Sequence, residues 1–217
     1  SSDLLSGDGR RIMIGWMQNW ETCDLQSADR KIFGQMTVPR ELEYINGRVY
    51  QNPVREIESY RTDKIICSGA IVYGNTIFEG INGRIIDLTV TIDFSKNAKA
   101  CDFLIELAGD EKYSTAMTYD HKKCEVTIDR SRSGCPKSDT NIRRFEVHPK
   151  NGILKIRMLL DINSIEFFFN DGEVAASVSI YTPLSADAIC FYADKEIKMD
   201  IEKYELQVPP ISILHQP

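Results

Sequence analysis

The stretch Ile153–Ile180 constrains the fold more than any other part of this 217-residue chain. It holds three apolar runs separated by two short polar breaks, Asp161–Ser164 and Asn170–Gly172. The second break contains Asp-Gly, and both residue types tolerate the positive φ that a tight hairpin turn requires. The stretch therefore predicts consecutive β-strands joined by tight turns, around which the rest of a β-rich fold is organised.

The run after the first break carries aromatic residues on both faces. In an extended strand, Ile165, Phe167 and Phe169 point to one face, and Glu166 and Phe168 point to the other. A strand with aromatic residues on both faces is typical of one that is covered on both. We therefore predict that this strand lies in the middle of a sheet, and it contains no catalytic machinery.

From Lys64 onward the sequence predicts strands alone. Ile86–Phe94 alternates apolar and polar residues, which is typical of a strand with one buried face. Two separate strands are expected near the end of the chain, at Ala188–Tyr192 and Ile197–Leu206. About ten short strands, with turn signals roughly every 8–12 residues, favour an antiparallel β-sandwich for residues 63–217.

Residues 1–62 have a different organisation. Two strands are expected at Arg10–Trp20 and Gly34–Val38, and two more on either side of the turn at Asn46-Gly47. This is the size and order of one blade of a β-propeller. A single blade cannot bury both faces of its sheet, so it needs neighbouring blades.

A short helix is expected between the blade and the sandwich. Asn52 can cap it, Pro53 suits its first position, and it would run over Val54–Arg61. The opening residues Ser1–Gly9 are neither a signal peptide nor a natural initiator, so we expect more polypeptide before them.

Composition excludes several classes of function. The net charge of −6 argues against a nucleic-acid groove or an anionic membrane surface, because both require clustered positive charge. No apolar run approaches the length of a membrane span.

The six cysteines show no Cys-x-x-Cys spacing and no ligand-like arrangement with the three histidines, so no metal site and no cofactor are expected. Scattered thiols favour a reducing compartment, here the cytoplasm, over disulfides.

Five segments together resemble glycoside hydrolase family 32, which includes invertases, sucrose-6-phosphate hydrolases, inulinases and levanases. They are Gly9–Trp20, Gly34–Leu42, Asn52–Glu56, Ile128–Gly134 and Ser164–Glu173. The resemblance covers nearly the whole chain in the right order. It implies an all-β fold: residues 1–62 as the last blade of a five-bladed β-propeller with a linker helix, and residues 63–217 as the C-terminal β-sandwich.

The resemblance implies retaining hydrolysis of β-fructosides, for which two carboxyl groups stand about 5 Å apart across the glycosidic bond. The family places them in an Asn-Asp-Pro-Asn-Gly motif and a Glu-Cys motif, with an Arg-Asp-Pro motif binding the sugar. The sequence contains none of the three. Asn170–Gly172 lacks the proline, Glu21–Cys23 has an intervening threonine, and Cys124-Glu125 is reversed.

We therefore expect the C-terminal portion of a β-fructosidase whose partners are the remaining propeller blades. A stand-alone fructan-binding, lectin-like module is the alternative. A third hypothesis is a scaffold piece that completes a propeller in trans, and homo-oligomerisation through the sandwich is a further possibility.

Two groups of residues are candidates for binding sugar. Trp20, with Asn19 beside it, lies beyond the expected end of the first strand, where the resemblance implies an aromatic residue at the sugar pocket. Its alternative is a structural residue at the blade edge, and Trp16 is expected in the blade core because it continues the Ile12/Ile14 face. Asp129, Arg130 and Glu166 form a candidate secondary sugar site on the sandwich, the alternative being an Asp-Arg pair that stabilises a strand end.

Overall fold

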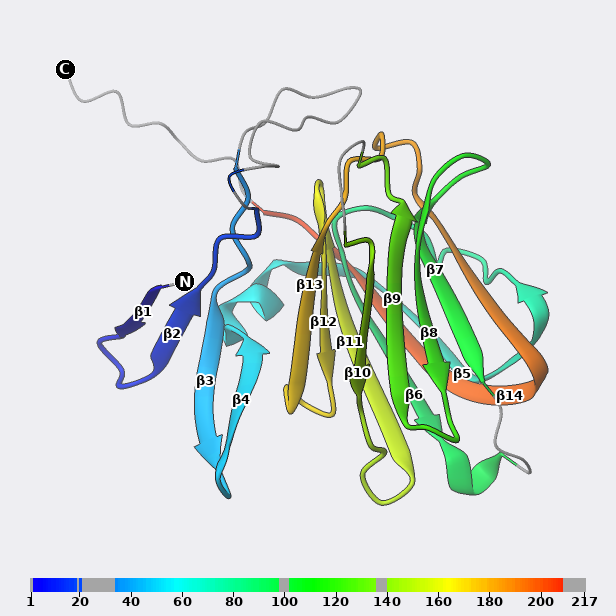
Figure 1. Ribbon diagram of the computed structural model, residues 1–217, viewed down its shortest axis with the longest axis horizontal. Coiled ribbons are helices and arrows are strands. Elements are labelled where there is room, and N and C mark those ends of the chain that lie inside the picture. The colour runs from blue at the N-terminus through cyan, green and yellow to red at the C-terminus, as the bar shows by residue number, and fades with distance from the viewer. Residues whose placement is uncertain (1, 19, 21–33, 98–101, 136–139, 209–217) are drawn as a thin grey trace.

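The computed structural model describes residues 2–18, 20, 34–97, 102–135 and 140–208. Its strands form a four-stranded sheet near the N-terminus and a ten-stranded sheet that makes up the rest of the fold (Figure 1). Both sheets are antiparallel. The fold is therefore all-β, as predicted. In the described ranges, no helix is long and apolar enough to cross a membrane.

The N-terminal sheet, which we call the blade, has the strand order β1-β2-β3-β4. Its strands are β1 (Ser2–Leu5), β2 (Arg11–Ile14), β3 (Arg40–Ile45) and β4 (Arg48–Pro53). The predicted hairpin is confirmed, since Asn46 and Gly47 have φ values of 49° and 83° and connect β3 to β4. The strand predicted at Gly34–Val38 is reduced to one isolated bridge between Met36 and Trp16.

The connection after the blade is η1 (Arg55–Tyr60), a 3-10 helix. The predicted helix is present, but its cap is wrong. Asn52 does not cap η1, because it belongs to β4 and its amide donates to the backbone carbonyl of Asp171, 2.8 Å away. The carboxylate of Glu41 instead accepts the N–H of Arg55, the first residue of η1, at 2.9 Å. A long-range contact thus takes the side chain that the local pattern assigned to the helix.

The sandwich is one sheet that curls over itself, with the order β10-β9-β8-β7-β14-β6-β11-β12-β13 and β5 paired to β14. Its strands are β5 (Arg61–Thr76), β6 (Ile86–Asp93), β7 (Phe103–Gly109), β8 (Ser114–Asp120), β9 (Glu125–Arg132), β10 (Ile142–Glu146), β11 (Ile153–Asp161), β12 (Ser164–Phe169), β13 (Val174–Ser179) and β14 (Ala188–Leu206). A second short 3-10 helix, η2 (Phe94–Lys96), follows β6.

β14 connects the two layers of this sandwich. Its first part pairs with β7 and its last part, from Asp200, pairs with β6, while β5 pairs along both parts. Register shifts lie between Ala193 and Ile197 and again between Met199 and Ile201. The two strands predicted in this region are therefore a single irregular strand. β5, which was not predicted as a strand, covers its other edge.

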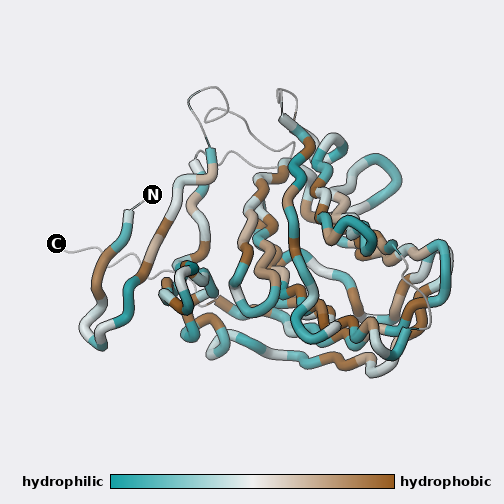
Figure 2. Tube along the Cα trace, turned by 60° about the horizontal axis from the view of Figure 1, so that its bottom comes forward, coloured by the Kyte–Doolittle hydropathy of each residue, from teal (hydrophilic) through white to brown (hydrophobic). Residues whose placement is uncertain are grey.

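The hydrophobic core lies between the two layers. It includes Val90, Ile92, Ile105, Met117 and Phe191, all fully buried. In Figure 2 the two blade strands farthest from the sandwich, β1 and β2, carry apolar residues away from this core. Leu4 and Leu5 of β1 are exposed. The blade therefore presents apolar surface that the sandwich does not cover.

The prediction for β12 is confirmed, because all six of its residues are buried. It lies between β11 and β13. Phe167 and Phe169 belong to the sandwich core. On the other face, the guanidinium of Arg40 lies over the ring of Phe168, 5.1 Å from its centroid. β12 is therefore covered by the core on one side and by the blade on the other.

Candidate functional site

The two tryptophans of the chain lie in contact at one end of the blade, beyond the end of β2. The ring centroids of Trp16 and Trp20 are 5.3 Å apart in an edge-to-face arrangement. Trp20 is 87% exposed and Trp16 is 41% exposed. Exposed indole faces suit the apolar face of a sugar ring. The expected burial of Trp16 in the blade core is not found in the described chain, and Asn19 lies outside the described residues.

Two short backbone segments hold this tryptophan end. The N–H of Met17 donates to the carbonyl of Gln35 (2.9 Å), and the N–H of Thr37 donates to the carbonyl of Gly15 (2.8 Å). The hydroxyl of Thr37 accepts the N–H of Gly15 at 2.9 Å. The segment carrying Trp16 is therefore fixed to the segment that enters β3.

The sandwich contacts both of these segments. The amide of Gln18 donates to the hydroxyl of Tyr181 at 3.2 Å, and the hydroxyl of Ser179 donates to the carbonyl of Met17 at 3.2 Å. The amide of Gln35 donates to the carbonyl of Asn163 at 2.8 Å. Burial raises the pKa of Tyr181 above its usual value, so its hydroxyl stays neutral at physiological pH.

Glu166 makes the most buried of these interdomain contacts. Its side chain is 1% exposed, and its Oε1 accepts the backbone N–H of Val38 at 2.5 Å. Its Oε2 pairs with the buried guanidinium of Arg40, which also donates to the hydroxyl of Ser177. The Glu166 carboxylate is therefore engaged by partners within the protein, and its place in a secondary sugar site stays a prediction. The sequence could not reveal the contacts with Val38 and Arg40, because these residues lie more than a hundred positions from Glu166.

The other two residues of that candidate site lie on β9. A carboxylate oxygen of Asp129 accepts the backbone N–H of Ser131 at 2.8 Å. The guanidinium of Arg130 donates to the carbonyl of Ser179 at 3.0 Å. These contacts assign Arg130 to the packing of the 179–181 segment, and a sugar site at Asp129 and Arg130 stays a prediction.

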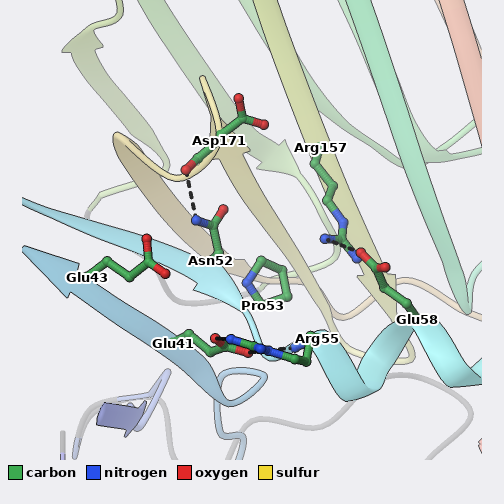
Figure 3. A pocket seen from close by; sticks show the side chains of 8 residues that line it. All are labelled: Glu41, Glu43, Asn52, Pro53, Arg55, Glu58, Arg157 and Asp171. Carbon is green, nitrogen blue, oxygen red and sulfur yellow. Dashed lines mark hydrogen bonds and ion pairs between the residues drawn. The ribbon is translucent and has the colours of Figure 1, made fainter. Parts of the chain in front are cut away.

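A polar pocket of about 290 Å³ lies between the blade, the linker and the sandwich (Figure 3). It is lined by Glu41, Glu43, Asn52, Pro53, Arg55, Glu58, Arg157 and Asp171. The guanidinium of Arg55 pairs with the carboxylate of Glu41 at 2.7 Å, and that of Arg157 lies 3.5 Å from the carboxylate of Glu58. Arg157 also pairs with the buried Asp87 at 2.7 Å. These ion pairs fasten η1 to both sheets.

The carboxyl groups of this pocket do not resemble a glycosidase pair. Hydrogen bonds from Arg55, helped by Arg10, lower the pKa of Glu41 to about 2. A general acid needs a pKa raised towards the working pH, so that it holds a proton to give to the leaving group. Glu41 is shifted in the opposite direction and acts as a permanent anion between two arginines.

In the described ranges, no group of three or more His, Cys, Asp or Glu side chains is placed to hold a metal ion. The fold and these contacts define a β-sandwich domain joined by a buried polar interface to a single blade. That blade carries the exposed tryptophan end.

Comparison with known proteins identifies the family. Residues 1–53 match the model of the glycosyl hydrolases family 32 N-terminal domain, and residues 56–208 match the model of the glycosyl hydrolases family 32 C terminal. The chain belongs to glycosyl hydrolases family 32. The boundary between the two matches falls at the connection between β4 and η1.

The most similar relatives include the levanase of Bacillus subtilis, 30% identical over 206 residues, with 88% of this chain and 30% of the levanase covered. A sucrose-6-phosphate hydrolase of Escherichia coli is 30% identical over 190 residues, with 88% of this chain and 38% of that protein covered. The structure of sucrose-6-phosphate hydrolase from Lactobacillus gasseri matches with a TM-score of 0.77 and 21% identity, covering 94% of this chain and 40% of that chain. The chain thus spans about a third of the length of the curated relatives it matches.

Proposed function

We propose that this chain is the C-terminal portion of a retaining β-fructosidase that acts on sucrose or a related β-fructoside. The observation that carries the proposal is the match of two consecutive family models, in order, to the blade and to the sandwich. The catalytic motifs of the family are absent from this sequence. The hydrolytic carboxylates would therefore come from other blades, and the sandwich would stabilise the last one.

Within that enzyme, Trp20 lines the sugar pocket. Its ring is 87% exposed and rests edge-to-face against that of Trp16. Aromatic faces of this kind stack on the C–H groups of a sugar, and a neighbouring amide such as that of Asn19 would donate to its hydroxyls.

A chimera tests the activity. The blades that this sequence lacks would be supplied by the N-terminal part of the Escherichia coli relative, fused before Ser2. We expect hydrolysis of a β-fructoside by the chimera and none by the isolated chain. An isolated chain that hydrolyses sucrose would contradict the proposal, as would a folded chimera that hydrolyses neither sucrose, sucrose-6-phosphate, levan nor inulin.

A stand-alone fructan-binding module is the second candidate function. It is favoured by one observation, namely that the tryptophan pair is already accessible without any other blade. Calorimetric titration of the isolated chain with levan and inulin separates the two candidates. Saturable binding would support the stand-alone module. A flat isotherm would favour the C-terminal portion of a β-fructosidase.

Two partners follow from the surfaces. The exposed Leu4 and Leu5 of β1 suit contact with a neighbouring blade, which would cover this apolar surface. β5 pairs with β14 along one edge and exposes Ile66, Ile71 and Tyr73, which makes it the candidate surface for homo-oligomerisation through the sandwich. Among the described cysteines, Cys67, Cys124 and Cys190 form no disulfide, which supports the cytoplasmic location that we propose.

A further inference from the structure

We infer that the sandwich sets the geometry of the tryptophan end of the blade, and that Glu166 is the positioning residue through which it does so. This inference rests on the proposed function for its meaning, because Trp20 matters to catalysis only if it lines a sugar pocket. The physical claim itself concerns the placement of the two indole rings, which can be measured without sugar.

The first step is the link from Glu166 to Val38. The carboxylate is buried and accepts the N–H of Val38 at 2.5 Å. The next residue, Pro39, has no backbone N–H to donate. Arg40 neutralises the same carboxylate from the first residue of β3. A buried, charge-assisted hydrogen bond is among the strongest polar contacts that a side chain can make to a backbone. The entry into β3 is therefore fixed relative to β12.

The second step runs from Val38 to the tryptophans. Thr37, next to Val38, exchanges two hydrogen bonds with Gly15, at 2.8 Å and 2.9 Å. Met36 bridges to Trp16, and Trp16 supports the ring of Trp20. A shift of Val38 would thus be transmitted through two hydrogen-bonded segments to the indole pair.

The third step concerns the other supports of this end. The contacts of Ser179 with Met17, of Tyr181 with Gln18 and of Asn163 with Gln35 are neutral hydrogen bonds of 2.8–3.2 Å. A neutral bond contributes roughly half as much as one to an ionised group. Of these four contacts between the sandwich and the tryptophan end, only the one made by Glu166 involves an ionised group, and β12 is buried on both faces.

The chain offers a sharp readout. Trp16 and Trp20 are its only tryptophans, so intrinsic tryptophan fluorescence and the tryptophan bands of the near-ultraviolet circular dichroism report on this end alone. All measurements use the complete 217-residue chain.

Two double variants separate the hydrogen bond to Val38 from the charge pair. Arg40→Met/Glu166→Gln removes both charges but keeps a carbonyl oxygen that can accept the Val38 N–H. Arg40→Met/Glu166→Leu also removes both charges and keeps a similar volume, but it has no acceptor. Neither variant leaves an unpaired buried charge, which is the usual cause of unfolding at such sites.

We expect Arg40→Met/Glu166→Gln to keep part of the near-ultraviolet signal of the tryptophan pair, because it retains a neutral, weaker hydrogen bond to Val38. Arg40→Met/Glu166→Leu should lose most of that signal, and its tryptophan fluorescence should become more accessible to a neutral quencher, while thermal unfolding stays cooperative. An unchanged tryptophan signal in a cooperatively folded Arg40→Met/Glu166→Leu protein would overturn the inference.

Glu173→Gln is the matched control. Glu173 also joins the sandwich to the blade, through its ion pair with Arg48 of β4, but it lies beside the β3–β4 hairpin, away from the tryptophan end. We expect no change in its tryptophan signal. A change equal to that of the Leu variant would show a general loosening of the interface, which overturns the assignment to Glu166.

Hydrogen exchange in the unmodified chain decides the matter if the Leu variant does not fold cooperatively. The amides of Val38, Thr37 and Met17 should then be protected to a similar degree, and more strongly than those of β1. Rapid exchange at Val38 would overturn the inference. Since none of these readouts uses sugar, their failure is distinct from the failure of the chimera to hydrolyse a β-fructoside.

Discussion

Gly172 of the sandwich and Gln51 of the blade meet backbone to backbone. The N–H of Gln51 donates to the carbonyl of Gly172 at 2.8 Å, and a Cβ added to Gly172 would lie 2.4 Å from the carbonyl oxygen of Gln51. The hairpin turn after β12 is thus inserted against β4. Its glycine is required twice, for the positive φ of 86° and for the close approach of the blade.

The first prediction concerns that approach. Gly172→Ala should destabilise the chain by roughly 2–4 kcal/mol, since the strain of a positive φ adds to a clash with rigid backbone. Gly152→Ala is the matched control: its φ is 79°, but nothing lies within 4 Å of the added Cβ. It should cost only about 1 kcal/mol. The free energy of unfolding of both variants is measured by urea denaturation. If the two variants lose equal amounts, the clash with Gln51 is relieved without a cost in stability.

The second prediction concerns the buried carboxylate of Asp87, which is 1% exposed between the guanidinium groups of Arg61 and Arg157. Asp87→Asn leaves the two arginines only the longer contacts of 3.5–3.6 Å with the half-exposed Glu58, so we expect a loss of roughly 3–5 kcal/mol in the free energy of unfolding. Glu202→Gln removes the exposed pair with Lys64, 3.4 Å apart, and should cost at most about 1 kcal/mol. Chemical denaturation of both variants gives the comparison, and similar losses would contradict the prediction.

The third prediction concerns pH. In the folded state the pKa of Glu41 falls from 4.5 to about 2, chiefly through hydrogen bonds from Arg55. A depressed pKa contributes stability that is present above the unfolded value and is lost as the pH falls towards the folded one.

The free energy of unfolding should therefore decline between about pH 4.5 and pH 2 by an amount on the order of 1–3 kcal/mol that Glu41→Gln no longer shows. Parallel pH profiles of the two proteins would exclude this role for Glu41.

The fourth prediction concerns Trp20 in the chimeric enzyme. Trp20→Ala should raise KM or lower kcat and leave the unfolding temperature nearly unchanged, because the side chain is 87% exposed. Tyr44→Ala is the control, since Tyr44 is an exposed aromatic residue of the same blade, near the hairpin at its other end. Steady-state kinetics that are unchanged for Trp20→Ala would remove Trp20 from the sugar pocket.

Local chemistry made part of this fold predictable. The Asn46-Gly47 turn and the alternation in β12 follow from φ preferences and side-chain periodicity, which act within a few residues. The family resemblance rested on short segments and is confirmed by the two family models. The continuity of β14 was missed because the polar residues at its register shift, Asp194–Glu196, look like a turn.

The interface could not be predicted from the same signals. Glu166 alternates with aromatic residues, which indicates an outer face of a sheet but not what covers it. Its partners are Arg40, the first residue of β3 in the other sheet, and Val38 just before it, and neither has a local feature that marks it. Asn52 was assigned to a helix cap for the same reason, because its contact with Asp171 depends on how the two sheets dock.

The course of β14 also affects how the protein is made on the ribosome. Since residues 188–206 join both layers of the sandwich, neither layer can be closed onto the other until this late segment has been synthesised. Translation must therefore expose every earlier strand of the sandwich before its core can form. Nascent chains of this protein should consequently depend on chaperones that shield unpaired strands, more than chains whose domains close early.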